Sequence, residues 1–169
     1  MEIKTSFNQI DEDKAKLSII EKKLIQLGLS LPEVPKPVAA YVPAKKVNNL
    51  IFTAGQLPMV EGSIICAGIL GSDVEIEDAN KAAQICTLNA LAAIKGLVED
   101  LDNIKQIVRV VGYVASAKNF IQQPAVVNGA SELLLELFGE NGKHARSAVG
   151  VVVLPLNAAV EIELTVEVI

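Results

Sequence analysis

The chain has 169 residues, of which 51% are hydrophobic, and it carries a formal net charge of −5. This length and apolar content suit one folded domain and exclude a disordered chain. The acidic balance, the low aromatic content and the lack of Trp argue against nucleic acid as a partner. With two Cys and one His, a zinc site lacks ligands, so we expect no metal.

The sequence also bears on where the protein works. No apolar run reaches the roughly 18–20 residues of a membrane span, and the N-terminus lacks the apolar core of a secretory signal. We interpret Cys66 and Cys86 as reduced, buried thiols, since their spacing suits neither a metal nor a redox pair. We therefore expect a cytoplasmic protein without a membrane partner, and the high apolar fraction predicts surface buried between subunits.

The first part of the chain predicts a helix followed by a connector. Apolar residues recur at helical spacing from Asp11 to Leu27, and Gly28 is a natural end for that helix. Prolines at 32, 35 and 37 indicate a stiff extended segment. Residues 1–36 are therefore expected to form an N-terminal helix and connector, and residues 37–169 the main domain.

The main domain is expected to begin with two strands. Val38–Val42, which contains Tyr41, and Leu50–Ala54 flank the turn pair Asn48-Asn49. Gly55 then ends the second strand in a loop. A glycine there lets the backbone approach a ligand closely, although a simple turn is the commoner reason for it.

Two helices and three strands are predicted in the rest of the chain. One helix runs from Asp73 or Glu75 to about Asp100, with a stripe of small and aliphatic residues toward the core. That stripe is Ala79, Ala83, Cys86, Ala90, Ile94 and Leu97. The remaining elements are a strand at Ile107–Ala115, a helix at Ala125–Phe138, and strands at Arg146–Leu154 and Ala159–Ile169. Helices gathered on one face of a mixed sheet make an α+β two-layer sandwich.

Arg146 stands out because it begins a strongly apolar strand of small and β-branched residues. Such a run is typical of a strand covered on both faces. Arg146, Ala148 and Gly150 share one face of it, so small side chains leave space beside the guanidinium. The guanidinium needs an anionic partner, which is either a carboxylate of the protein or an acidic ligand.

Glu161 and His144 are the other titratable residues of interest. Glu161 lies on the polar face of the last strand, where a solvated carboxylate is the ordinary interpretation. It would come near the cleft if its strand were the antiparallel neighbour of the Arg146 strand. We interpret His144 as a loop or interface residue rather than a base, pointing away from Arg146 if it is already in the strand.

Four pieces of sequence together resemble the RidA/YjgF family. They are Phe52–Pro58 (Phe-Thr-Ala-Gly-Gln-Leu-Pro), Ala145–Val149 (Ala-Arg-Ser-Ala-Val), Leu154-Pro155 and Val160–Glu163. The resemblance covers about residues 37–168 in collinear order, and the added N-terminal helix resembles a longer branch. Members are reactive-imine deaminases and have also been described as translation inhibitors and endoribonucleases.

The resemblance implies a chorismate-mutase-like fold and a homotrimer whose sheets enclose a barrel, with clefts between neighbouring subunits. It implies that Arg146 binds a substrate carboxylate and that Glu161 lies near the reacting nitrogen, and these are our two candidate catalytic residues. Tyr41, Gly55 and Asn128 are the further substrate-binding residues that it implies.

Three functions are therefore considered. The first is cofactor-free hydrolytic deamination of small imines or enamines that carry a carboxylate, giving a 2-keto acid and ammonia. The second is a non-catalytic trimeric binding protein for small carboxylic acids, which is favoured by Ala54, Ala148 and Ser131 where the family commonly has Ser, Cys and Tyr. An endoribonuclease is disfavoured, since the chain is acidic and lacks a pair of His residues.

Overall fold

The computed structural model describes residues 17–33 and 40–169. Its helices are α2 (Ile19–Gln26), α3 (Ile76–Val98) and α4 (Gln123–Phe138). Its strands are β1 (Ala44–Val47), β2 (Leu50–Thr53), β3 (Met59–Val60), β4 (Ser63–Ile64), β5 (Ile104–Ala115), β6 (Ala145–Val151) and β7 (Val160–Val168). Short 3-10 helices occupy Leu101–Asn103, Gly139–Gly142 and Pro155–Asn157. Of the helices described, none has the length and apolar character needed to cross a membrane.

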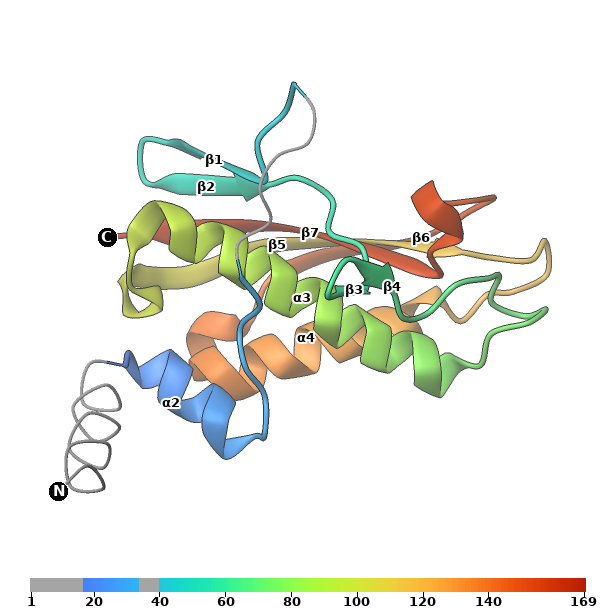
Figure 1. The fold of residues 1–169 in the computed structure, drawn as a ribbon, viewed down its shortest axis with the longest axis horizontal. Coiled ribbons are helices and arrows are strands. Elements are labelled where there is room, and N and C mark those ends of the chain that lie inside the picture. The colour runs from blue at the N-terminus through green and yellow to red at the C-terminus, as the bar shows by residue number, and fades with distance from the viewer. Residues whose placement is uncertain (1–16, 34–39) are drawn as a thin grey trace, which may run out of the picture.

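Five strands form one mixed sheet in the order β1-β2-β7-β5-β6. Only β5 and β6 pair in parallel, and the other neighbours are antiparallel. Figure 1 shows α3 and α4 lying along the same face of this sheet. The predicted α+β two-layer sandwich, with its helices on one face, is confirmed.

The sheet buries one face because its central strand alternates as the sequence predicts. In β7 every second side chain is buried against the helices, and the residues between them are only partly covered. The buried set is Val160, Ile162, Leu164, Val166 and Val168. The hairpin at Asn48-Asn49 is confirmed too, since Val47 pairs with Leu50 and Asn48 takes a φ of 54°.

Glycines set how closely α4 approaches its neighbours. A Cβ on Gly129 would lie 2.0 Å from the carbonyl oxygen of Asn80 in α3, and the Asn80 amide donates to the carbonyl of Ala125 at 3.0 Å. A Cβ on Gly112 of β5 would lie 2.4 Å from a methyl of Val127. These contacts fix the position of α4 against both α3 and the sheet.

The first predicted strand is wrong in its position. Ala40 and Tyr41 lie in a bend, Val42 is not in a strand, and the strand begins only at Ala44. Pairing with β2 decides this, because Ala44 is the residue opposite Thr53, where β2 ends. Val38 and Ala39 lie outside the described residues.

The Arg146 strand also differs from expectation. β6 ends at Val151 and lies at the sheet edge, and Val152 and Val153 are 83% and 64% exposed. The expected cover on both faces is therefore absent among the described residues. Its expected antiparallel pairing with the last strand is wrong as well, because β5 lies between β6 and β7. Leu97, predicted for the core, is 44% exposed at the end of α3.

The N-terminal helix is shorter than predicted within the described residues. It begins at Ile19 because Ser18 and Glu21 form a capping box, in which the Glu21 amide N–H donates to Ser18 Oγ at 3.0 Å. It ends as predicted at Gly28, which takes a φ of +72°, and the Leu29 amide donates back to the Leu24 carbonyl at 2.9 Å. Residues 11–16 of the expected helix lie outside the described ranges.

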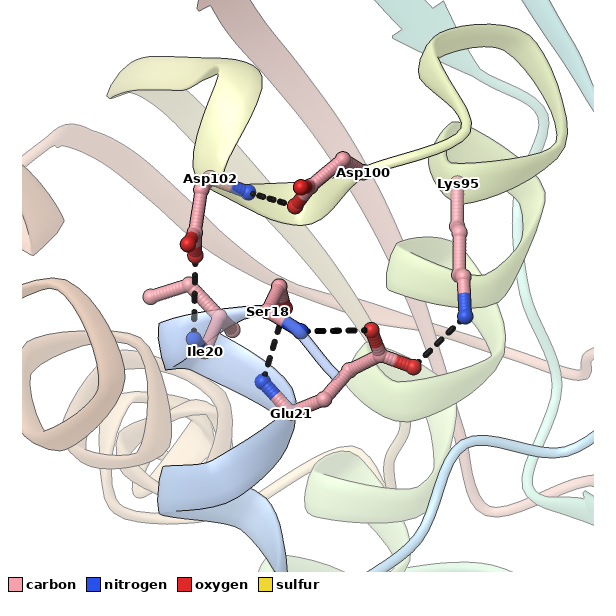
Figure 2. Close-up of polar contacts among 6 residues, drawn as sticks. All are labelled: Ser18, Ile20, Glu21, Lys95, Asp100 and Asp102. Carbon is pink, nitrogen blue, oxygen red and sulfur yellow. Dashed lines mark hydrogen bonds and ion pairs between the residues drawn. The ribbon is translucent and has the colours of Figure 1, made fainter. Parts of the chain in front are cut away.

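Polar contacts attach α2 to the main domain. Asp102 accepts hydrogen bonds from the amides of Ile19 and Ile20 at 2.8 and 3.0 Å, and so caps the helix N-terminus. Lys95 of α3 pairs with Glu21 at 2.5 Å, as Figure 2 shows. At the other end, Lys23 Nζ donates to the carbonyl of Leu137 in α4 at 2.7 Å. The helix is therefore held at both ends.

The two cysteines are both free thiols. Cys86 is buried in α3, as predicted, and burial raises the pKa of its thiol well above the ordinary value. Cys66 is only partly buried, so the prediction of a buried thiol holds for one of the two.

We predict that Asp102→Ala loosens α2, because two amide N–H groups lose their acceptor. The expected loss is about 0.5–2 kcal/mol, as for other N-caps, and it should be concentrated in the docking of α2. Hydrogen exchange measured by mass spectrometry should show faster exchange across Ile19–Gln26. Glu136→Ala, which removes an exposed carboxylate from α4, is the control. Unchanged exchange in α2 would contradict this account of its attachment.

Candidate functional site

The Arg146 side chain lies against α4. Arg146 pairs with Val110 of β5, whose side chain is buried beneath the helices, so it is on the helix side of the sheet. Its Nη1 donates to Asn128 Oδ1 at 2.8 Å and to Ser131 Oγ at 3.1 Å. Asn128 and Ser131 are three residues apart and share one face of α4. The helix thus presents two oxygen acceptors to one guanidinium nitrogen.

No carboxylate of the described residues neutralises this guanidinium. The ion pairs there are Lys95–Glu21, Lys105–Glu167 and Lys143–Glu140. The acceptors that do contact Arg146 are an amide and a hydroxyl, which orient the guanidinium without cancelling its charge. The side chain is also exposed, so an anion from solution can reach it. Of the two partners considered for Arg146, a carboxylate of the protein is therefore not found within residues 17–33 and 40–169.

His144 lies on the same side as Arg146, which corrects the expectation that it points away. It precedes β6, and strand residues two apart share a face. Its Nδ1 is 2.6 Å from the carbonyl oxygen of Gly142, and its Nε2 is 3.0 Å from Ser131 Oγ. A carbonyl only accepts, so Nδ1 carries the proton and the neutral ring accepts at Nε2 from the Ser131 hydroxyl. Burial, together with the Arg146 charge, holds the pKa of His144 below its ordinary value.

Glu161 occupies a different place, on the face of β7 that the helices do not cover. It is half-buried against Gly55, where an added Cβ would fall 1.6 Å from Glu161 Oε1. Only glycine at position 55 leaves room for this carboxylate. Burial raises the pKa of Glu161, and the neighbouring Glu163 carboxylate adds to the rise. A carboxyl group with a raised pKa is suited to moving a proton near neutral pH.

Tyr41 lies close to Gly55 along the fold. It stands two residues before Pro43, whose carbonyl accepts from the amide of Ala54 at 2.9 Å. Its side chain is 59% exposed, so it is free to contact a ligand or another subunit.

The predicted site residues therefore form two groups in one chain. Arg146 and Asn128 lie on the helix side at the sheet edge, whereas Gly55 and Glu161 lie on the other face. The strand β5 also separates them, since it lies between β6, which carries Arg146, and β7, which carries Glu161. The expected approach of Glu161 to Arg146 within one chain is wrong, because β6 and β7 are not neighbours.

Ser131 and His144 were not chosen as site residues from the sequence. A signal did exist, since Ser131 is one helical turn after Asn128 and His144 stands two residues before Arg146. Recognising it required knowing that α4 packs beside β6. Outside the ranges left undescribed, no group of three or more His, Cys, Asp and Glu side chains could hold a metal ion.

Comparison with known proteins establishes the family. The profile of the family described as "YjgF/chorismate_mutase-like, putative endoribonuclease" matches residues 21–168. The chain belongs to this YjgF family. The match confirms the resemblance found in the sequence and the chorismate-mutase-like fold, and it includes most of α2.

Individual proteins similar to this chain cover most of its length. Protein TCP17 of Trypanosoma cruzi is 36% identical over 149 residues, which is 88% of this chain and 93% of TCP17. The crystal structure of Atu1372 from Agrobacterium tumefaciens is 42% identical and superposes with a TM-score of 0.82, covering 89% of this chain and 92% of Atu1372. A 2-iminobutanoate/2-iminopropanoate deaminase of Dermatophagoides farinae is 28% identical over 136 residues, covering 80% of this chain and 91% of the deaminase.

The three positions that the sequence resemblance singled out as departures border these two groups. Ala54 directly precedes Gly55, Ala148 follows Arg146 on the same face of β6, and Ser131 contacts Arg146. The Arg146 group therefore keeps its cation and the small residues beside it, but it has no thiol at position 148.

We predict that Glu161→Gln stabilises the fold at neutral pH. Because the folded pKa of Glu161 is raised, its contribution to stability is fully present below the unfolded pKa near 4.5 and is lost as pH rises through the folded pKa. Glutamine does not ionise, so this loss does not occur in the variant. The expected gain in the free energy of unfolding is less than about 1 kcal/mol, because half of the side chain stays in solvent. Urea unfolding should show the gain at pH 7 and little at pH 4, with the exposed Glu132→Gln as control. An equal effect at both pH values would refute it.

Proposed function

We propose that this YjgF-family protein is a cofactor-free hydrolase that deaminates small imines or enamines bearing a carboxylate. The observation that carries the proposal is the Arg146 guanidinium, which two neutral oxygens orient and no carboxylate of the described residues neutralises. A planar guanidinium of this kind binds a carboxylate through two parallel hydrogen bonds. The relative from Dermatophagoides farinae, whose name states this activity, adds support.

In the proposed reaction, Arg146 holds the carboxylate of a 2-imino acid, and Asn128 and Ser131 keep the guanidinium in place. A water near Glu161 adds its oxygen to the C=N carbon, and the Glu161 carboxylate takes the proton that this water releases. The carboxyl group then gives this proton to the nitrogen, which leaves a carbinolamine with a hydroxyl and an amino group on the same carbon. The Glu161 carboxylate next takes the hydroxyl proton and passes it to the amino nitrogen, so that the C=O bond forms as the C–N bond breaks. The products are a 2-keto acid and ammonia, with one water consumed and Glu161 returned to its starting state.

One chain places Arg146 and Glu161 on opposite faces of the sheet, so this mechanism requires a second copy. We propose a homotrimer in which the Arg146 group of one subunit faces the Glu161 group of its neighbour. The sheet face opposite the helices supports this, since it carries the exposed side chains of Phe52 and Val149. The apolar run through Val153 suits the same interface, because no described residue covers its outer side in one chain.

A second candidate is a binding protein for small carboxylic acids that performs no chemistry. Ala148 favours it, because the position two residues after Arg146 offers no reactive group. In both candidates Arg146 binds the acid, and only turnover separates them.

We further propose a cytoplasmic location, for which the two free thiols are suitable. Nucleic acid remains disfavoured as a partner on the acidic charge of the chain.

We predict that the protein accelerates the release of ammonia and 2-oxobutyrate from freshly generated 2-iminobutyrate. Arg146→Ala should lower kcat/KM roughly 100-fold, as expected when about 3 kcal/mol of charge-assisted hydrogen bonding is removed. The kcat/KM of Arg146→Lys should lie between those of the unsubstituted protein and Arg146→Ala, since lysine keeps the positive charge but lacks the planar group that donates two parallel hydrogen bonds. Lys143→Gln removes a nearby cation that pairs with Glu140 and should leave the rate unchanged. No acceleration over the spontaneous rate, at several protein concentrations, would end the deaminase proposal.

Calorimetry with 2-oxobutyrate and with benzoate separates the second candidate from the first. A binding protein should bind these acids without accelerating imine hydrolysis, and Arg146→Ala should abolish the binding. Equal binding by Arg146→Ala would refute Arg146 as the carboxylate ligand in both candidates. Degradation of RNA that persists in Arg146→Ala after stringent purification would indicate a contaminant or another site.

A further inference from the structure

Three hydrogen bonds connect the guanidinium of Arg146 to the backbone just before β6. Arg146 Nη1 donates to Ser131 Oγ at 3.1 Å, and Ser131 Oγ lies 3.0 Å from His144 Nε2. His144 Nδ1 donates to the carbonyl oxygen of Gly142 at 2.6 Å. The directions agree along the whole chain of bonds, since the Ser131 hydroxyl accepts from Arg146 and donates to a neutral His144. Gly142 itself is buried against α4, where an added Cβ would meet the Leu134 carbonyl at 2.3 Å.

We propose that Ser131 and His144 are positioning residues that hold the Arg146 guanidinium and couple the binding of a carboxylate to the uptake of one proton by His144. The inference rests on the proposed function only in taking the anion on Arg146 to be a carboxylate. It does not require turnover.

The coupling follows from the order of donors and acceptors. When His144 takes a proton from solvent, Nε2 becomes a donor to Ser131 Oγ. The hydrogen of the Ser131 hydroxyl can then turn away from His144 and toward an anion on Arg146. The second positive charge also attracts that anion. An anion on Arg146 in turn weakens the repulsion between the guanidinium and a protonated His144, and this reciprocity is required by thermodynamic linkage.

Other charged groups on the elements around His144 are placed differently. They are Glu132 and Glu136 on α4, Glu140 and Lys143 near Gly142, and Arg109 on β5. Lys143 and Glu140 bind each other at 2.9 Å, and Arg109 donates to Ser147 on the other face of β6. Glu132 and Glu136 are exposed. Arg146 is the charged side chain that lowers the pKa of His144, after burial itself.

The experiment uses the fact that His144 is the only histidine of the chain. Proton NMR of untagged protein therefore gives one imidazole to titrate. In free protein we expect a pKa below about 6.5. Arg146→Gln should raise it by on the order of half a pH unit or more, as expected from removing a charge two hydrogen bonds away. Lys143→Gln, a matched loss of one positive charge, should leave it almost unchanged.

Saturating 2-oxobutyrate, which stays ionised from pH 5.5 to 8, should also raise the pKa of His144 in the unsubstituted protein. Calorimetry should accordingly show the Kd of 2-oxobutyrate falling from pH 8 to pH 5.5, by up to roughly threefold if binding raises the pKa of His144 by about half a pH unit. His144→Gln keeps a polar side chain but cannot titrate. It should bind the acid with an affinity that changes less with pH, because only the Glu161 carboxylate of the proposed intersubunit site still titrates beside the acid.

The outcomes separate this inference from the proposed function. If the acid binds and the pKa of His144 does not move, the coupling is wrong although Arg146 remains the carboxylate ligand. If His144→Gln keeps the pH dependence, the coupling is likewise wrong. If the acid does not bind at any pH, both the coupling and the proposed function are contradicted. No acceleration of imine hydrolysis over the spontaneous rate, by a protein that shows the full pH linkage, would contradict the proposed function alone.

Discussion

The close packing of α4 between α3 and the sheet is the constraint on which the site depends. Gly129 allows the α4 backbone to reach the carbonyl oxygen of Asn80, and Gly112 leaves room for Val127 on β5. Both contacts are too close for any Cβ, so α4 has little freedom to shift or rotate. Asn128 lies between these two contacts and Ser131 follows one turn later. The packing of the core therefore decides where two acceptors meet Arg146.

An arginine held in this way differs from one in a salt bridge. A carboxylate partner would cancel its charge and occupy its fork, whereas an amide and a hydroxyl leave the charge available. The sheet edge keeps the guanidinium in contact with solvent, which limits the desolvation that an uncompensated cation suffers. The fold thus orients a positive charge without neutralising it. This arrangement suits a site for a small acid better than a structural role.

Local sequence patterns predicted most of the secondary structure, but they did not predict which distant strands pair in the sheet. The alternation in β7, the Asn48-Asn49 hairpin and the Gly28 helix end each depend on a few neighbouring residues. The parallel pairing of β5 with β6 joins segments far apart in sequence. It places β5 between Glu161 on β7 and Arg146 on β6, which the sequence patterns did not predict. Likewise, the contact of Asn128 with Arg146 was expected only from the family resemblance. The apolar run after Arg146 suggested a buried strand, and it is also what a strand covered by another subunit would show.

The central claim is that Arg146 remains open to a carboxylate from solution in the assembled protein. A crystal structure of the protein soaked with 2-oxobutyrate tests it most directly. The account predicts the carboxylate of the acid on the Arg146 guanidinium, with Asn128 and Ser131 keeping their present contacts and Glu161 of a neighbouring subunit facing the keto carbon. A guanidinium already bound to a carboxylate of the polypeptide, with the acid absent, would contradict it.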